Sequence, residues 1–373
     1  MAHAYTPGLR VTERAPIRKE RRLPITGEVL VKAGERVSAE KVVARTELPG
    51  DVATVNVVNQ LAISPSELPR HMLKREGERV ARDEPIAETK PLINWFKRAV
   101  RSPVDGVIES VSNITGQVLI RTAPRRVELT AYVDGVVAEV FEGEGVAVET
   151  TGALVQGIFG VGGETHGEVV VAAESPEANL RPDDLKEDHV GKIVVGGSLV
   201  TSEVYERASA IGVAALVCGG FHDRDLRRLL GYDLGVAITG HEPIRPTLII
   251  TEGFGPIAMA EGTFALLKAN EGRRASANGA TQIRAGVLRP EIIIPRPDLA
   301  GGEEDERPAM GLTVGSPVRI IREPGFGKIG RVRSLPAGLQ EIETEARVRV
   351  VEVEFPEGHT AIVPRANVEA IEK

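Results

Sequence analysis

The chain reads VLVKAGERVSAEKVVA over residues 29–44 and LKREGERVARDEPIA over residues 73–87. Both stretches contain Gly-Glu-Arg-Val, at Gly34–Val37 and again at Gly77–Val80, between two short apolar runs. A glycine in this setting is typical of a tight turn that joins two strands. Because an internal repeat indicates a duplicated structural unit, we predict a small barrel built from duplicated β-hairpins.

Further glycine-centred segments accompany the repeat. LPGDV (48–52) and SPVDGVI (102–108) each predict the start of a strand beside one copy. DGVVAEVFEGEGVAVET (134–150) has the same strand–glycine–strand pattern, and we interpret it as a third, degenerate copy. The all-β region is therefore expected to extend to about residue 150.

Composition limits the class of protein. At 373 residues the chain is too long for one ordinary core, so several domains are expected. Aromatic residues are only 3%, which leaves the cores to Val, Ile, Leu and Ala. The net charge of -7 argues against broad electrostatic capture of nucleic acid. A single cysteine excludes an intrachain disulfide and favours the cytoplasm, and no apolar run is long enough for a membrane span.

The pattern changes to alternating strands and helices after about residue 152. GKIVVGG (191–197) and VAALVCGG (213–220) read as buried strands, and residues 198–212 between them have helical spacing. Such alternation predicts βαβ units. The segment 191–220 loosely resembles the swivelling β/α domains of the protease-associated and aconitase types, and we transfer no activity from it.

We therefore predict a multidomain fold that is mostly β with a central α/β domain. The predicted parts are a basic arm (1–23), a β region (24–150), the α/β domain (151–295), a Pro- and acid-rich linker (296–311) and a C-terminal barrel (312–373). The basic arm is either a solvated segment or a contact arm for an anionic partner.

Residues 24–128 resemble the biotinyl/lipoyl-like barrel-sandwich hybrid, on the segments Val31–Val37, Gly77–Ala87 and Ser102–Val111. In carrier members of that family, a lysine at a hairpin tip takes the biotin or lipoyl group. The nearest candidate, Lys90, stands in Glu-Thr-Lys-Pro without a flanking Met or Asp-Lys-Ala. We therefore interpret this region as a non-carrier module and expect no cofactor.

The stretch KPLINWFKRAVRSP (90–103) interrupts this β region and contains Trp95, the only tryptophan, beside Phe96. It is expected to form a short amphipathic helix. The helix would either close one end of the barrel or expose an anchor for a partner, since Trp and Arg are enriched at interface hot spots.

The C-terminal residues resemble a KOW/SH3-like barrel of the kind found in NusG-type transcription factors, on residues 315–321 and 324–332. The resemblance implies that the first hairpin contacts RNA or a protein partner. The implied surface residues are Arg319, Arg322, Phe326, Lys328, Arg331 and Arg333. Residues 312–373 carry nine Lys/Arg and nine Asp/Glu, so this module is neutral and protein binding stays open beside RNA binding.

A ligand pocket is predicted at the strand ends of the α/β domain, because carboxyl ends of parallel strands converge on one edge. Its predicted lining is Thr239, His241, Glu252, Gly253, Gly255, Asn278 and Thr281. The loop at residues 250–256 could hold an anion at the following helix start, or serve only as a connecting turn. Gly157–Gly163 lacks the Lys-Ser/Thr ending of a P-loop and reads as β-turns.

Cys218 ends an apolar strand, and His222 follows four residues later. This pair is either a nucleophilic or metal-binding combination or a buried structural cysteine beside an unrelated histidine. No CxxC or HxH spacing, catalytic triad order or Walker sequence accompanies it. We therefore expect no metal site and assign no enzyme class.

The leading hypothesis is a cytoplasmic, non-enzymatic adaptor that binds protein partners in a transcription- or translation-associated assembly. One alternative is an enzyme or sensor with a small anionic ligand at the 196–284 edge. Another is RNA binding through the C-terminal hairpin. Homo-oligomerisation is left open, and no membrane partner is expected.

Overall fold

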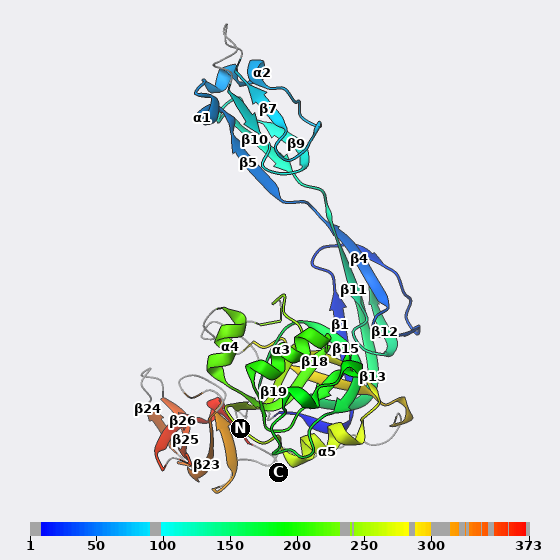
Figure 1. Cartoon of the computed structure of the whole chain (residues 1–373), viewed down its shortest axis with the longest axis vertical. Helices are drawn as coiled ribbons and strands as arrows, with labels where there is room; N and C mark the ends of the chain where they lie inside the picture. The colour runs from blue at the N-terminus through cyan, green and yellow to red at the C-terminus, as the bar shows by residue number, and fades with distance from the viewer. Residues whose placement is uncertain are drawn as a thin grey trace.

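The computed structural model is mostly β, with several sheets and a half-barrel. It describes residues 9–89, 98–231, 239–240, 242–282, 288–299, 314–320, 325, 328–336, 338–341, 347–356 and 358–370. A small lobe projects from the main body on a long two-stranded ribbon, and a separate β module lies beside the body (Figure 1). Within the described residues, no helix is both long and apolar enough to cross a membrane.

The two Gly-Glu-Arg-Val copies belong to two separate β units. The first unit, in the body and ribbon, contains β1 (Val11–Arg22), β2 (Glu28–Val29), β3 (Arg36–Val37), β4 (Val42–Leu48), β11 (Arg125–Thr130), β12 (Gly135–Phe141) and β13 (Gly145–Gln156). The second unit, in the lobe, contains β5 (Val52–Asn56), α1 (Val57–Leu61), η1 (Pro65–Glu67), α2 (Leu68–His71), β6 (Arg79–Val80), β7 (Pro85–Glu88), β8 (Ala99–Arg101), β9 (Gly106–Val111) and β10 (Gln117–Arg121).

Strand pairing is the same in both units. The short strand of each repeat pairs with the strand that follows an Asp-Gly-Val turn: Val37–Gly135 and Arg36–Val136 in the first unit, Val80–Gly106 and Arg79–Val107 in the second. The hairpin β4–β11 of the first unit also matches the hairpin β7–β8 of the second. Each has a register shift after its first pair: Val42–Thr130 is followed by Ala44–Leu129, and Pro85–Arg101 is followed by Ala87–Val100. The sequence repeat is thus a structural duplication.

The repeated residues have the same roles in both turns. Gly34 and Gly77 have φ values of +83° and +87°, a conformation that glycine adopts without a steric penalty. Their amides donate to the carbonyls of Val137 and Ile108, each at 2.7 Å. The carboxylates of the neighbouring glutamates accept the amides two residues before each glycine, which closes the turns.

The second unit is inserted at the hairpin tip of the first. Strands β4 and β11 pair as far as Leu48–Arg125, and the antiparallel ribbon resumes with Val52–Arg121 in β5 and β10. At the junction a side chain on Gly50 would lie 2.0 Å from the Thr122 carbonyl oxygen, so only glycine fits there. Two connections, both within this ribbon, therefore join the lobe to the body.

This insertion corrects two sequence predictions. The counterpart of SPVDGVI (102–108) is residues 131–137, and not LPGDV (48–52), which lies at the ribbon junction. Residues 134–150 are not a third copy, because β12 and β13 close the first unit as β9 and β10 close the second. The misreading arose because the second unit separates the two parts of the first.

The predicted basic arm is also corrected. Residues 11–22 form β1, which pairs along β13 inside the large sheet. Its cations meet carboxylates of the same chain: Arg18 with Glu139 and Glu149, Lys19 with Glu291, Arg21 with Glu164, and Arg22 with Glu20 and Glu144. The anionic partner of this strand is therefore the body of the protein itself.

The central domain has the predicted alternation of strands and helices. Its elements are β14 (Phe159–Val161), β15 (Glu164–Val171), β16 (Ile193–Val195), β17 (Leu199–Val200), α3 (Ser202–Ile211), β18 (Ala215–Phe221), α4 (Asp223–Leu230), β19 (Thr247–Phe254), α5 (Glu261–Ala269), β20 (Arg274–Asn278) and β21 (Glu291–Pro295). Strands β15, β16, β18 and β19 are parallel neighbours, and β20 and β21 join them antiparallel and continue to β13. Helix α3 begins after the cap Thr201 and ends at Gly212, which has φ +86°.

The C-terminal module is a six-stranded antiparallel sheet. Its strands are β22 (Pro317–Ile320), β23 (Ile329–Ser334), β24 (Leu339–Glu341), β25 (Arg347–Glu354), β26 (Thr360–Pro364) and β27 (Val368–Ala370). Its core consists of Val and Ile side chains from these strands together with Phe355, which follows β25. The segment that was predicted to be a linker lies largely outside the described residues, at positions 300–313.

Candidate functional site

At the strand ends of the central domain, where a ligand pocket was predicted, the chain's own backbone packs closely against three glycines. A side chain on Gly197 would lie 2.4 Å from the carbonyl oxygens of Ser175 and Ala178. On Gly219 it would lie 2.3 Å from the Ile257 carbonyl, and on Gly220 it would lie 1.9 Å from the Gly255 carbonyl. The glycines at these strand ends therefore permit close backbone packing at these positions. A cavity of about 540 Å³ remains at the start of α4, directly after β18, and it is lined by His222, Asp223, Arg224, Asp225 and Arg227.

Two of the predicted pocket residues, Thr239 and Thr281, do come together, but they form a closed hydrogen-bond network with backbone groups. The Thr239 hydroxyl donates to the Gly160 carbonyl at 2.8 Å, and the Thr281 amide donates to the Thr239 hydroxyl at 2.8 Å. The Gly160 amide donates to the Thr281 hydroxyl at 2.9 Å. Both threonines are at most 2% exposed. Their polar atoms bind backbone of the Gly157–Gly163 strand region, so they fix the fold there.

The remaining pocket candidates divide between structural roles and undescribed positions. The Asn278 side chain accepts the Ala280 amide at 2.9 Å, which closes a local turn. Gly253 pairs with Gly220 across β18 and β19, and Gly255 has φ +100° in the turn that follows. His241 lies outside the described residues, and its neighbour Glu242 accepts the amides of Gly162 and Gly240.

Glu252 contacts a different part of the molecule from the two threonines. Its carboxylate accepts a hydrogen bond from Arg319 at 2.5 Å and one from the Ala260 amide at 3.1 Å. Arg319 also binds Glu369 at 2.9 Å, and Glu369 binds Arg289 at 2.6 Å. All four side chains are at most 8% exposed. This cluster, the four-charge network, joins the central domain to the C-terminal module.

The prediction that Arg319 lies on the binding surface is therefore wrong. The residue is 1% exposed, because its strand β22 faces the central domain and its guanidinium bridges two carboxylates. Its exposure was implied by the resemblance to a KOW/SH3-like barrel, and the sequence held no signal that Glu252, sixty-seven residues away, was its partner.

Other predicted contact residues of the C-terminal module are exposed. Lys328, Arg331 and Arg333 all lie at the surface; Arg331 donates to the Gly315 carbonyl, and Arg333 pairs with Glu352 at 3.4 Å. Arg322 and Phe326 lie outside the described residues. The exposed cations are thus spread over a module whose total charge is neutral.

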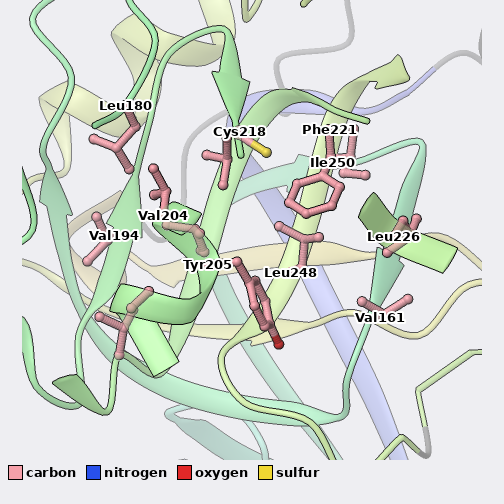
Figure 2. Packing of buried hydrophobic residues seen from close by; sticks show 14 of the residues in the cluster. Val161, Leu180, Val194, Val204, Tyr205, Cys218, Phe221, Leu226, Leu248 and Ile250 are labelled. Carbon is pink, nitrogen blue, oxygen red and sulfur yellow. The ribbon is translucent and has the colours of Figure 1, made fainter. Parts of the chain in front are cut away.

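Cys218 is a core residue. It is fully buried among apolar side chains of the central domain, with Leu180, Val204 and Ile250 around it (Figure 2). Burial raises the pKa of its thiol well above the ordinary range, so the reactive thiolate is suppressed. His222 is exposed at the start of α4 and makes no pair with it. The described residues contain no cluster of three or more potential metal ligands.

The projecting lobe is the part of the molecule that the sequence did not distinguish from the body. Its hydrophobic core is composed of its own residues, between Val55 and Ile120, and it packs under the helices α1 and α2. Among the described residues of the lobe, the large exposed apolar side chains are Val52, Leu73 and Ile114, which are 42%, 43% and 89% exposed. Lys90, Trp95 and Phe96 lie outside the described residues, between β7 and β8. The lobe is thus a self-contained unit held away from the body (Figure 1).

No protein-family model matches the chain, and no curated protein matches it.

Proposed function

We propose that this protein is a non-enzymatic cytoplasmic adaptor that presents its projecting lobe (52–121) to a protein partner. The observation that carries the proposal is the inserted second unit, which has its own core and is joined to the body through one two-stranded ribbon. A duplicate that only stabilised the body would be expected to pack against it. A duplicate held at a distance has most of its surface free for contact.

The central domain supports an architectural role for the body. Backbone packs closely against the glycines at its strand ends, its only cysteine is buried, and Thr239 and Thr281 bind carbonyl and amide groups of the same chain. Arg289, Glu252, Arg319 and Glu369, which are buried and charged, pair with one another in the four-charge network. These features favour a rigid base over the small-ligand pocket of the alternative hypothesis.

The charge distribution agrees with a protein contact at the lobe. Residues 52–121 carry ten Lys/Arg and eight Asp/Glu, a net charge of +2, although the whole chain has a net charge of -7. A near-neutral surface with exposed apolar side chains is typical of protein interfaces and lacks the strong positive field of a nucleic-acid binder.

A variant that lacks only the lobe tests this function. Because Leu48 pairs with Arg125, residues 49–124 can be replaced by Asn-Gly, which closes a two-residue hairpin on β4 and β11. Tagged full-length protein is expected to retain one stoichiometric partner from its native lysate, and the lobe-deleted protein is expected to lose it. Equal recovery with both proteins would place the contact elsewhere, and no stoichiometric partner with either would refute the adaptor function.

RNA binding through the C-terminal module is the second candidate, supported by the exposure of Lys328 and Arg331. Substitution of both by Gln should abolish a salt-sensitive affinity for single-stranded RNA, with Arg70→Gln on the lobe as the matched control. An absence of RNA binding by the wild-type protein at low salt would exclude this function.

A further inference from the structure

The two units offer an internal comparison of the same surface. In each unit, the residues just after the Gly-Glu-Arg-Val strand lie against the residues just before the Asp-Gly-Val turn. In the first unit these are Ala39, Glu40 and Tyr132; in the second they are Arg82, Asp83 and Pro103. The backbone contacts correspond, since Asp134 accepts the Ala39 amide at 2.6 Å and Asp105 accepts the Arg82 amide at 2.8 Å.

In the first unit this end is covered by the central domain. Ala39 and Tyr132 are 3% and 4% exposed. Glu40 forms ion pairs with Arg274 and with His166, and the Ser276 hydroxyl donates to the Tyr132 carbonyl at 2.5 Å. The end of this type of unit is therefore a surface that can dock on protein.

In the second unit the same end is uncovered. Arg82, Asp83 and Pro103 are all exposed, and so are the neighbouring Arg101 and Asp105. We call these five residues the free end of the lobe. Among the described residues, the carboxylate of Asp83 and the guanidinium of Arg82 have no partner; Arg82 is bonded only through its backbone amide, and Asp83 through its backbone groups.

The backbone of the free end is held in place before any partner binds. The Asp83 amide donates to the Ser102 carbonyl at 2.8 Å, and the Ser102 amide donates to the Glu84 carbonyl at 2.9 Å. Ser102 is 1% exposed, and its hydroxyl donates to the Val104 carbonyl at 2.6 Å. A preorganised surface loses less conformational entropy when it docks.

The charges of the free end are compatible with a second copy of the same surface. Two arginines and two aspartates give it no net charge, so two copies of this surface can meet without the repulsion that any net charge would cause. Arg82 and Asp83 are adjacent and opposite in sign, so a twofold axis can place each against its complement on the other molecule. Such reciprocal pairing is the defining property of an isologous interface.

We propose that the free end is a homodimer interface, at which Arg82 of one molecule pairs with Asp83 of a second copy of this chain, and the reverse. The free end adjoins Gly106 and Val107, and Val107 pairs with Arg121 where the ribbon enters the lobe, so the dimer joins two lobes at their ribbon-side ends. The inference is independent of the partner that the adaptor captures.

Sedimentation velocity of the full-length protein over a concentration series tests this interface. The wild-type protein is expected to dimerise. Arg82→Glu places like charges at both reciprocal contacts and is expected to weaken dimerisation at least about tenfold. Arg82→Glu combined with Asp83→Lys restores opposite charges and is expected to recover the dimer. Arg70→Asp, a comparable charge change on the exposed end of α2, is the matched control and should leave the dimer intact.

Asp83 has φ +64°, where Lys is less favourable than Asp, so folding must be checked separately. Asp83→Asn removes the charge, tolerates this backbone and is expected to weaken the dimer without loss of circular dichroism. A monomeric wild-type protein, a dimer unaffected by Arg82→Glu, or a free end that binds only a different protein would each overturn the proposal. A protein that captures its partner but does not dimerise would refute the homodimer interface and leave the adaptor function intact. The two proposals can therefore fail separately.

Discussion

Removal of Arg319 is the most informative single change in the body of this protein. Its guanidinium lies between Glu252 at 2.5 Å and Glu369 at 2.9 Å, and all three side chains are almost fully buried. Deletion of one member of a buried ion pair leaves an uncompensated charge, which costs about 3–5 kcal/mol. Arg319→Met keeps most of the side-chain length and removes only the charge and the donors.

The remaining contacts place the expected cost near the lower limit. Without Arg319, Glu369 keeps Arg289 at 2.6 Å, but Glu252 keeps only the Ala260 amide at 3.1 Å. In addition, the Nε atom of Arg319 is buried without a hydrogen-bond partner among the described residues, so the wild-type network already carries a penalty. We therefore expect a loss of about 3 kcal/mol in the free energy that holds the C-terminal module to the central domain.

Hydrogen exchange measured by mass spectrometry reports this loss directly. Amides of β19, β22 and β27 that exchange through separation of the two parts should exchange roughly 150-fold faster in Arg319→Met, since 1.4 kcal/mol is a factor of ten. Arg333→Met is the matched control, because its pair with Glu352 is exposed and surface pairs contribute about 0–1 kcal/mol. Adding Glu252→Gln to Arg319→Met should recover about 1–2 kcal/mol of the loss. An effect as small as that of Arg333→Met would refute the buried network.

Further outcomes follow from other parts of the molecule. An excised fragment of residues 52–121 should fold cooperatively in urea and give dispersed NMR amide signals, because its core uses only its own residues; a random-coil spectrum would contradict this. Gly106→Ala in that fragment should cost about 1–3 kcal/mol, since its Cβ would lie 2.4 Å from the Arg121 carbonyl, and a neutral effect would refute the close approach. Cys218 should react with a thiol reagent at neutral pH only in denaturant, since burial raises its pKa; rapid labelling of the native protein would argue against its buried position. Desolvation lowers the pKa of His189, so the unfolded state binds more protons and stability should fall as pH drops below the unfolded value near 6.5; His189→Gln should flatten that part of the stability profile, and an unchanged profile would assign the dependence elsewhere.

The sequence predicted local structure well where one segment determines it. Apolar runs bounded by glycines gave the parallel strands β16, β18 and β19 and the helices between them, because burial pattern and capping residues are local signals. The Gly-Glu-Arg-Val turns were predicted for the same reason: a glycine with positive φ and a glutamate that caps the turn lie within four residues of each other.

Relations between distant segments were not predictable in this way. The basic strand β1 was taken for an arm because its cations are visible in the sequence, whereas its carboxylate partners, such as Glu164 and Glu291, lie more than 140 residues away. The exposure predicted for Arg319 came from the resemblance to a KOW/SH3-like barrel, which carries no information about its buried partners Glu252 and Glu369. A charged side chain carries no local mark of whether its partner is water or a distant carboxylate of the same chain.

The nesting of the two units links these observations to function. A unit whose hairpin tip receives an entire second unit has lost that tip as a site of its own, and the corresponding hairpin of the second unit, formed by β7 and β8, lies on the projecting lobe. The first unit uses its other end to dock on the central domain through Glu40 and Tyr132. The second unit has kept the same end and changed its residues from buried Ala39 to exposed Arg82. The neutral set of two arginines and two aspartates on a fixed backbone is compatible with the reciprocal pairing proposed for this end.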